Sequence, residues 1–252
     1  MCSCPFRESD MTKCYSKSNE VLKALSPADF MLLKPHLSPV DLPVRTSLEH
    51  RHKAIESVYF IETGVASVVS GTPHEVELAI IGKEGMTGVS LVLASEEEAP
   101  FESYMQVAGS GLRIASADLR HAIDQSVPLH RVLLRCAHSF LKQATENSLG
   151  NVLGSMEQRL ARWLLMVNDR LEGNEIPLTH EFMGIMLGVH RSGMTLAVQE
   201  LERMGAIGQR RARIDILDRS ILEEMTEEIY ANPNPVASSA NRTAKRIAFA
   251  LE

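Results

Sequence analysis

The spacing of hydrophobic positions changes along the 252-residue chain. Residues 19–36 show a helical period, with Leu22 and Leu25 first and then, after Pro27, Phe30 and Leu33. From Leu42 to Ala117, short runs rich in Val, Ile, Tyr and Phe are separated by Gly, Pro or Ser at intervals of about ten residues. These runs are ESVYFIETGVASVVSG, EVELAIIGKEG, GVSLVLAS and YMQVAGSGLRIAS. Such short, regularly interrupted runs predict an all-β barrel or jelly roll.

The helical period returns between residues 127 and 150, where the apolar positions form two stripes. One stripe has the 4-3-4 spacing of a two-helix coiled coil, and it consists of Leu129, Leu133, Cys136, Phe140, then Gln143 or Ala144, and Asn147. The adjoining stripe is Leu134, Ala137 and Leu141. A helix with two apolar stripes contacts two surfaces, which we expect to be its own barrel and a second copy of the chain. The predicted dimer interface is Leu129, Leu133, Cys136, Phe140 and Asn147; the alternative is a buried helix in a monomer.

Another helix is predicted over residues 156–171, and the segment EGNEIPLT after it is a predicted loop. Thr179 can then cap a helix that runs to about Leu187, and Gly188 supplies a tight turn. A second helix begins near Arg191 and buries Met194, Val198 and Leu201. This order of small, turn-forming and apolar positions predicts a helix-turn-helix motif, with an ordinary helical hairpin as the alternative.

The second helix of such a motif enters the DNA major groove, and its N-terminal residues face the base edges. Arg191 could bind a guanine through two hydrogen bonds, and Gln199 could meet an adenine. The predicted DNA-binding residues of the motif are Thr179, His190, Arg191, Ser192, Thr195 and Gln199. For each of them the alternative is plain solvent exposure.

The segment GQRRARIDIL after Ile207 predicts a hairpin, because Ile214 and Ile216 alternate as in a strand. Its turn carries Arg210, Arg211 and Arg213, which we predict to lie on DNA phosphates. Residues 188–213 contain five Arg and two Glu, a local positive excess on a chain whose net charge is −6. The sequence therefore predicts a local basic patch in place of general coating of nucleic acid.

The composition of the chain limits its class and its location. Apolar residues make up 44% of the chain, enough for a core, but no apolar run reaches the length of a membrane span. The segment MCSCPFRESDMTKC lacks the apolar region of a secretory signal, so a cytoplasmic protein is expected. The predicted organisation is a flexible segment 1–18, a β-roll sensor domain 19–126, a dimerisation helix 127–150, a winged helix-turn-helix domain 151–230 and a disordered tail 231–252.

The segment RLARWLLMVNDRLEGNEIPLTHEFMGIMLGVHRSGMT resembles a proteobacterial branch of the Crp/Fnr family of transcription regulators. The segment VYFIETGVASVVS is also similar to the first barrel strands of that family. The resemblance extends over roughly residues 19–230. It implies an α+β fold with an N-terminal β-roll of the cyclic-nucleotide-binding kind, a long dimerisation helix and a C-terminal winged helix-turn-helix. It also implies a homodimer on a near-palindromic DNA site, with RNA polymerase as a candidate partner.

Two departures from the family pattern bear on ligand and target. Cyclic-nucleotide-binding members use a Gly-Glu-Leu segment for the ribose and an Arg-Ser-Ala or Arg-Thr-Ala segment for the phosphate. The corresponding stretches here are Gly88-Val89-Ser90 and Glu102-Ser103-Tyr104, and a Glu would repel a phosphate, so no cyclic nucleotide is expected. The family's recognition pattern Arg-Glu-x-x-x-Arg appears as Arg191-Ser192 with Leu196 at the third place, which indicates a different target sequence.

Two alternatives involve metals. Cys2, Cys4, Cys14 and Cys136 match the cysteine count of iron–sulfur members of the family, but their spacing differs, so the alternative is a redox-responsive or iron–sulfur-responsive regulator. His50, His52 and Glu56 match the first metal motif of cupins, with His74 the only candidate for the second, which leaves a cupin-type metalloenzyme as a rival. No nucleophile–His–carboxylate grouping is evident. The chain is therefore interpreted as a regulator that is not an enzyme and needs no cofactor.

Overall fold

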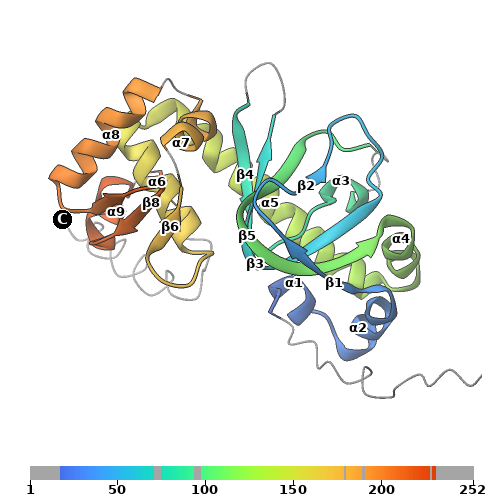
Figure 1. The fold of residues 1–252 in the computed structure, drawn as a ribbon. Helices are drawn as coiled ribbons and strands as arrows, with labels where there is room; N and C mark the ends of the chain where they lie inside the picture. The colour runs from blue at the N-terminus through green and yellow to red at the C-terminus, as the bar shows by residue number, and fades with distance from the viewer. Residues whose placement is uncertain are drawn as a thin grey trace, which may run out of the picture.

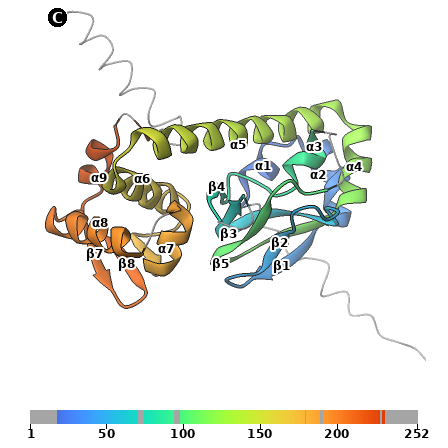
Figure 2. The same cartoon turned by 90° about the horizontal axis from the view of Figure 1, so that it is seen from above.

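The computed structural model describes residues 18–70, 75–93, 98–178, 180–188, 191–227 and 229–230. A β-sheet with short helices forms an N-terminal domain, and a helical unit with a small sheet forms a C-terminal domain (Figure 1). The long helix α5, Val127–Leu153, runs along both domains, as Figure 2 shows from above. The predicted α+β order of β-roll, long helix, helix-turn-helix and wing is confirmed.

The described part of the chain starts with two short helices, and the second begins at Pro27 as expected. The side chain of Asn19 accepts a hydrogen bond from the Leu22 amide and caps α1, Glu20–Lys23. Ser26 caps α2, Pro27–Leu33, with Pro27 in the first turn, and a 3-10 turn, Lys34–His36, follows. These helices pack beneath the sheet through Leu22 and Leu33, which are fully buried.

The N-terminal sheet is antiparallel and is built around two long strands. Its strands are β1, Ser38–Leu42; β2, Ser47–Glu49; β3, Ser57–Val69; β4, Glu77–Ile81; and β5, Glu102–Ala115. The order is β1-β5-β3-β4, and β2 also pairs with β5. The pairing of β3 with β5 shifts register near Thr63, where a Cβ on Gly109 would lie 1.9 Å from the Thr63 carbonyl oxygen. Glycine is therefore required for the two strands to approach at this irregularity.

Three elements differ from the sequence-based expectation. In its described residues, 88–93, the run GVSLVLAS forms a short helix, α3, Val89–Val92, in place of the expected strand. It follows Gly88, whose φ of 75° lies in the left-handed region and ends extended backbone. The segment EGNEIPLT, predicted as a loop, contains the short strand β6, Glu175–Pro177. Helix α4, Ser116–Gln125, was not predicted. A short apolar run does not distinguish strand from helix by its period, which explains the first error.

The stripe of α5 that was predicted to face a second subunit lies mainly against the β-domain of its own chain. Leu129 and Leu133 are fully buried in the core of their own domain, and Cys136 packs against the same core. Phe140 stacks at a tilt on Phe101, with ring centroids 6.4 Å apart, and the Asn147 amide donates to the Leu78 carbonyl at 2.7 Å. Leu129, Leu133 and Asn147 are thus covered by their own chain and are not free for a second subunit. For Cys136 and Phe140, which are partly buried, the dimer contact stays a prediction.

The buried stripe of α5 also covers the free edge of β4. The amide of Gln143 accepts from the Ile80 N–H at 2.6 Å and donates to the Ile80 carbonyl at 3.1 Å. With the hydrogen bond from Asn147 to Leu78, these contacts satisfy backbone groups that an edge strand would otherwise expose. The junction between sheet and helix is thus fixed by amide side chains.

The C-terminal domain is a helical unit on a small antiparallel sheet. Its helices are α6, Met156–Asn168; α7, His180–Leu187; α8, Arg191–Arg203; and α9, Arg219–Met225. Its strands β6, β7 (Ile207–Arg210) and β8 (Arg213–Ile216) lie in the order β6-β8-β7. A capping box between Ser155 and Gln158 begins α6, and the expected inward residues Leu160, Trp163, Leu164 and Val167 are all buried. Within the described ranges, no helix is both long and apolar enough to cross a membrane.

Candidate nucleic-acid interface

The helices α7 and α8 meet at a turn that requires glycine. Gly188 has a φ of 64°, in the left-handed region that other residues rarely adopt. The nearest atom to a Cβ placed there is a methyl of Val76 at 3.5 Å, so backbone conformation and not crowding explains this glycine. The turn lies where the sequence predicts it, between a helix ending at Leu187 and one beginning at Arg191.

One side of α8 is fixed in the domain core. Met194, Val198 and Leu201 are fully buried, and they pack with α6 and α7 residues such as Trp163 and Met183. At about 1.5 to 3 kcal/mol for each fully buried side chain of this size, the three residues hold the helix firmly. The opposite side of α8 is consequently presented to solvent in a set orientation.

The exposed side of α8 carries a short series of polar and apolar side chains. Ser192 and Gln199 are exposed and Thr195 is partly exposed. Leu196 is 66% exposed, which is unusual for leucine on a helix with a well-packed core side. Figures 1 and 2 place α7 between α8 and the β-domain, so α8 lies on the outer side of the molecule.

Some predicted DNA-binding residues lie outside the described residues. Thr179 and His190 are among them, and although α8 begins at Arg191, the side chain of Arg191 is not described. Leu196 was not predicted as a contact. The signal that could have found it was its place in the sequence, where the family resemblance shows a recognition residue.

The wing arginines differ in their surroundings. Arg210 is largely exposed and pairs with Asp215 at 3.1 Å. Arg213 is held between Glu175 at 2.7 Å and Asp215 at 3.0 Å, so it ties β6 to the hairpin. Arg211 is exposed and forms no ion pair with any described residue. Arg211 and Arg210 at the hairpin tip are therefore better placed than Arg213 for a phosphate.

The hairpin tip also contains strained backbone. Arg210 pairs with Arg213 across a two-residue turn, and Ala212 in that turn has a φ of 57°. A left-handed conformation costs a residue with a Cβ roughly 1 to 2 kcal/mol. The turn nevertheless projects the arginines beyond the body of the domain.

The metal alternatives gain no support from the geometry. Cys2, Cys4, Cys14 and His74 lie outside the described residues. Burial raises the pKa of the Cys136 thiol to about 11, which favours the protonated form that binds metals poorly. His50, His52 and Glu56 are all exposed, and the part of the chain that the structure describes brings no three metal-ligating side chains together.

Comparison with known proteins agrees with this arrangement. Residues 158–225 match the model of the Crp-like helix-turn-helix domain. The structure resembles a regulator of the crp/fnr family from Eubacterium rectale, with a TM-score of 0.66, 18% identity and coverage of 83% of this chain and 98% of that chain. It also resembles FixK2 from Bradyrhizobium japonicum, with a TM-score of 0.65, 18% identity and coverage of 75% and 97%. TTHB099, a CRP-family regulator from Thermus thermophilus, matches with a TM-score of 0.63, 15% identity and coverage of 77% and 98%. No curated protein sequence matches the chain.

The fold and the exposed helix together define the class of domain, a helix-turn-helix unit joined to a β-domain by a long helix. More particularly, residues 158–225 form a Crp-like helix-turn-helix domain, and the fold of the chain is similar to that of solved regulators of the Crp/Fnr family.

Proposed function

We propose that the chain acts as a homodimer that binds a near-palindromic duplex, with one α8 helix in each of two successive major grooves, and that its β-domain senses a signal. The observation that carries this proposal is the outward side of α8 in a domain whose other side is fully packed. A helix presented in this way is the reading element of such motifs.

The side chains on α8 indicate how bases would be recognised. Leu196 offers an apolar surface that suits the methyl group of thymine, and Gln199 one turn further suits adenine. Arg191, at the start of the helix, suits guanine. Arg210 and Arg211 would add phosphate contacts, which increase affinity without choosing a sequence.

The exposed stripe of α5 supports the dimer. Val127, Leu134 and Leu141 are spaced seven residues apart and are 64%, 37% and 63% exposed. This is the repeat of a two-stranded coiled coil. Leu149, Val152 and Leu153 are further exposed apolar residues at the end of the helix. A monomer in water would leave this apolar strip uncovered.

Selection of bound sequences from random duplex DNA tests DNA recognition. We expect a palindromic consensus under both aerobic and anaerobic conditions, because the proposal requires no oxygen-labile cluster. Arg191→Ala should weaken binding to that consensus by about 1 to 3 kcal/mol, as loss of a two-hydrogen-bond base contact does. Leu196→Ala should chiefly relax the preference at one base pair. An Arg191→Ala protein that binds the consensus normally would refute the role assigned to α8.

Sedimentation equilibrium tests the dimer. Leu141→Glu should place two like charges in the shared stripe and shift the protein to monomer, with loss of cooperative binding to the palindrome. Ser139→Glu is the matched control, because Ser139 is exposed on another side of the same helix. A wild-type protein that sediments as a monomer would contradict the proposal.

A further inference from the structure

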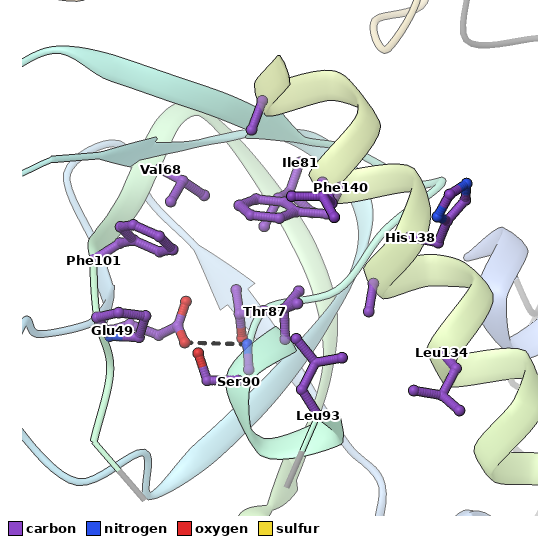
Figure 3. Close-up of a pocket in the computed structure, with 16 residues that line it drawn as sticks. Glu49, Val68, Ile81, Thr87, Ser90, Leu93, Phe101, Leu134, His138 and Phe140 are labelled. Carbon is purple, nitrogen blue, oxygen red and sulfur yellow. Dashed lines mark hydrogen bonds between the residues drawn. The ribbon is translucent and has the colours of Figure 1, made fainter. Parts of the chain in front are cut away.

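A cavity of about 470 Å³ lies between the β-sheet and α5 (Figure 3). Its size is within the range of small-molecule sites. The sheet contributes Val68 and Ile81, the loops contribute Leu93 and Phe101, and α5 contributes Phe140 and Leu141. These side chains make the wall mainly apolar.

The polar groups of the cavity are concentrated at one end. Glu49 faces the cavity there, and its carboxylate accepts hydrogen bonds from the Gly88 amide at 3.1 Å and the Ser103 hydroxyl at 2.9 Å. Figure 3 shows Ser90 and Thr87 beside it. Burial raises the pKa of Glu49, against the opposing effect of these two hydrogen bonds. Glu102, which the sequence comparison placed at the family's phosphate-binding position, is not part of the cavity wall; the carboxylate that faces the cavity is that of Glu49.

The charge of the wall disfavours anions. Among the described residues that line the cavity there is no lysine or arginine. His138 is the one described lining side chain able to become a cation, and Figure 3 shows it on the side of α5 away from Glu49. A phosphate or carboxylate in the cavity would lose its hydration and meet Glu49 without a compensating charge.

We propose that this cavity binds a small, mainly apolar and uncharged molecule whose single hydroxyl or amide group meets Glu49 and Ser90. The apolar body would displace water from Val68, Ile81, Phe101 and Phe140, and the polar group would use the remaining hydrogen-bonding capacity of the carboxylate. This inference names the ligand class of the sensing domain and so rests on the proposed function.

The cavity shares residues with the exposed stripe of α5. Leu134 and Leu141 line the cavity and are also 37% and 63% exposed. A bound molecule that contacts these side chains changes their position or mobility in the surface assigned to the second subunit. Ligand binding would therefore alter the dimer dissociation constant.

Isothermal titration calorimetry of the full chain with decanol and with decanoate tests the ligand class. The two probes share an apolar chain and differ in the charge of one end. We expect decanol to bind about tenfold or more tighter than decanoate, a difference of at least about 1.4 kcal/mol. Cyclic AMP, the anionic reference, should show no binding. Equal or tighter binding of either anion would overturn the proposal.

Two variants locate the site. Ala137→Phe should abolish decanol binding, because Ala137 is buried and lines the cavity. Ser139→Phe adds the same ring to an exposed position on α5 and should bind normally. Phe101→Ala enlarges the cavity and should shift preference from decanol toward dodecanol, which tests the site even if Ala137→Phe fails to fold. Identical binding by all these variants would overturn the assignment.

The inference would also be overturned if the wild-type protein bound no decanol. This is the result expected if the second subunit fills the cavity. Fluorescence anisotropy with duplex DNA, measured separately, distinguishes this failure from failure of the proposed function. DNA binding without decanol binding refutes only the ligand class. Decanol binding without DNA binding refutes only the regulator proposal.

Discussion

Trp163 of α6 donates its indole N–H to the carboxylate of Glu77 in β4, with 2.7 Å between the two heavy atoms. The bond joins the DNA-binding domain to the β-domain, and both side chains are buried. The second oxygen of Glu77 accepts from Ser67, whose hydroxyl also lies 3.0 Å from the Gln106 amide oxygen. One hydroxyl proton cannot serve both acceptors at once. A protonated Glu77 that donates to Ser67, while Ser67 donates to the Gln106 amide oxygen, gives each of these oxygens a partner and leaves the Gln106 amide nitrogen without one among the described residues.

Stability should therefore depend on the pH through Glu77. Burial raises its pKa from 4.5 to about 7, against hydrogen bonds from Ser67 and Trp163 and the charges of Arg170 and Arg162. The folded state binds the proton more tightly than the unfolded state does. The resulting stabilisation is fully present below pH 4.5 and is lost as the pH rises to about 7. At about 1.4 kcal/mol per pKa unit, the contribution is on the order of 3 kcal/mol.

The variant Glu77→Gln tests this linkage, since glutamine can form the same hydrogen bonds without titrating. We expect its stability relative to wild type to increase between pH 5 and 8, measured by urea unfolding with the fluorescence of the single tryptophan. Glu172→Gln, at an exposed loop position, serves as the control and should follow wild type. A constant difference between Glu77→Gln and wild type across this range would show that Glu77 does not titrate there.

Trp163→Phe removes the donor and keeps most of the apolar volume. We expect it to destabilise the protein by about 1 to 3 kcal/mol, because Glu77 is left buried with one hydrogen bond fewer. Unfolding followed by circular dichroism measures the loss. A double-mutant cycle with Glu77→Leu, which removes the acceptor, should show a non-zero coupling energy, whereas additive effects would mean that the 2.7 Å contact contributes nothing specific.

Gly193→Ala should separate stability from DNA affinity. A Cβ at this position in α8 meets no atom within 4 Å, so alanine should stabilise the helix by about 0.5 to 1 kcal/mol. If the helix lies in a groove, the same methyl group meets the duplex and weakens binding. Thermal unfolding and anisotropy measure the two effects. Gly205→Ala is the contrasting control, since its site is equally open but its φ of 76° makes alanine unfavourable.

Gly109→Ala should be strongly destabilising, by about 3 kcal/mol or more, because its Cβ would lie 1.9 Å from a backbone oxygen that cannot move aside alone. Comparison of melting temperatures with Gly193→Ala, the same substitution in open space, isolates the steric effect. A melting temperature near that of wild type would show that β3 and β5 can separate at Thr63 without cost.

The sequence was sufficient for the helix-turn-helix because local constraints determine it. Gly188 needs its left-handed backbone, and Met194, Val198 and Leu201 follow a helical spacing that only one orientation satisfies. The hairpin of the wing was also predicted from a local pattern, because Ile214 and Ile216 alternate with polar residues and both are buried. The DNA contacts themselves stay predictions.

The sequence was insufficient to predict features that depend on contacts between distant segments. Both stripes of α5 are apolar, so their spacing could not show which one meets the sheet. The amides of Gln143 and Asn147 were a missed signal, because a helix that carries them on its buried side can cover a strand edge. The pairing of Glu77 with Trp163 spans 86 residues, and no local pattern encodes a contact at that separation.

Leu134 and Leu141 have a consequence for evolution and engineering. Selection for a new inducer would act first on the shape of the hollow beside these leucines, yet each change there also modifies the strip offered to the sister subunit. If the cavity holds an inducer and the stripe meets a second subunit, as proposed, inducer preference and subunit affinity cannot change independently. A biosensor made by substituting these two leucines will need its DNA occupancy measured again as well as its ligand preference.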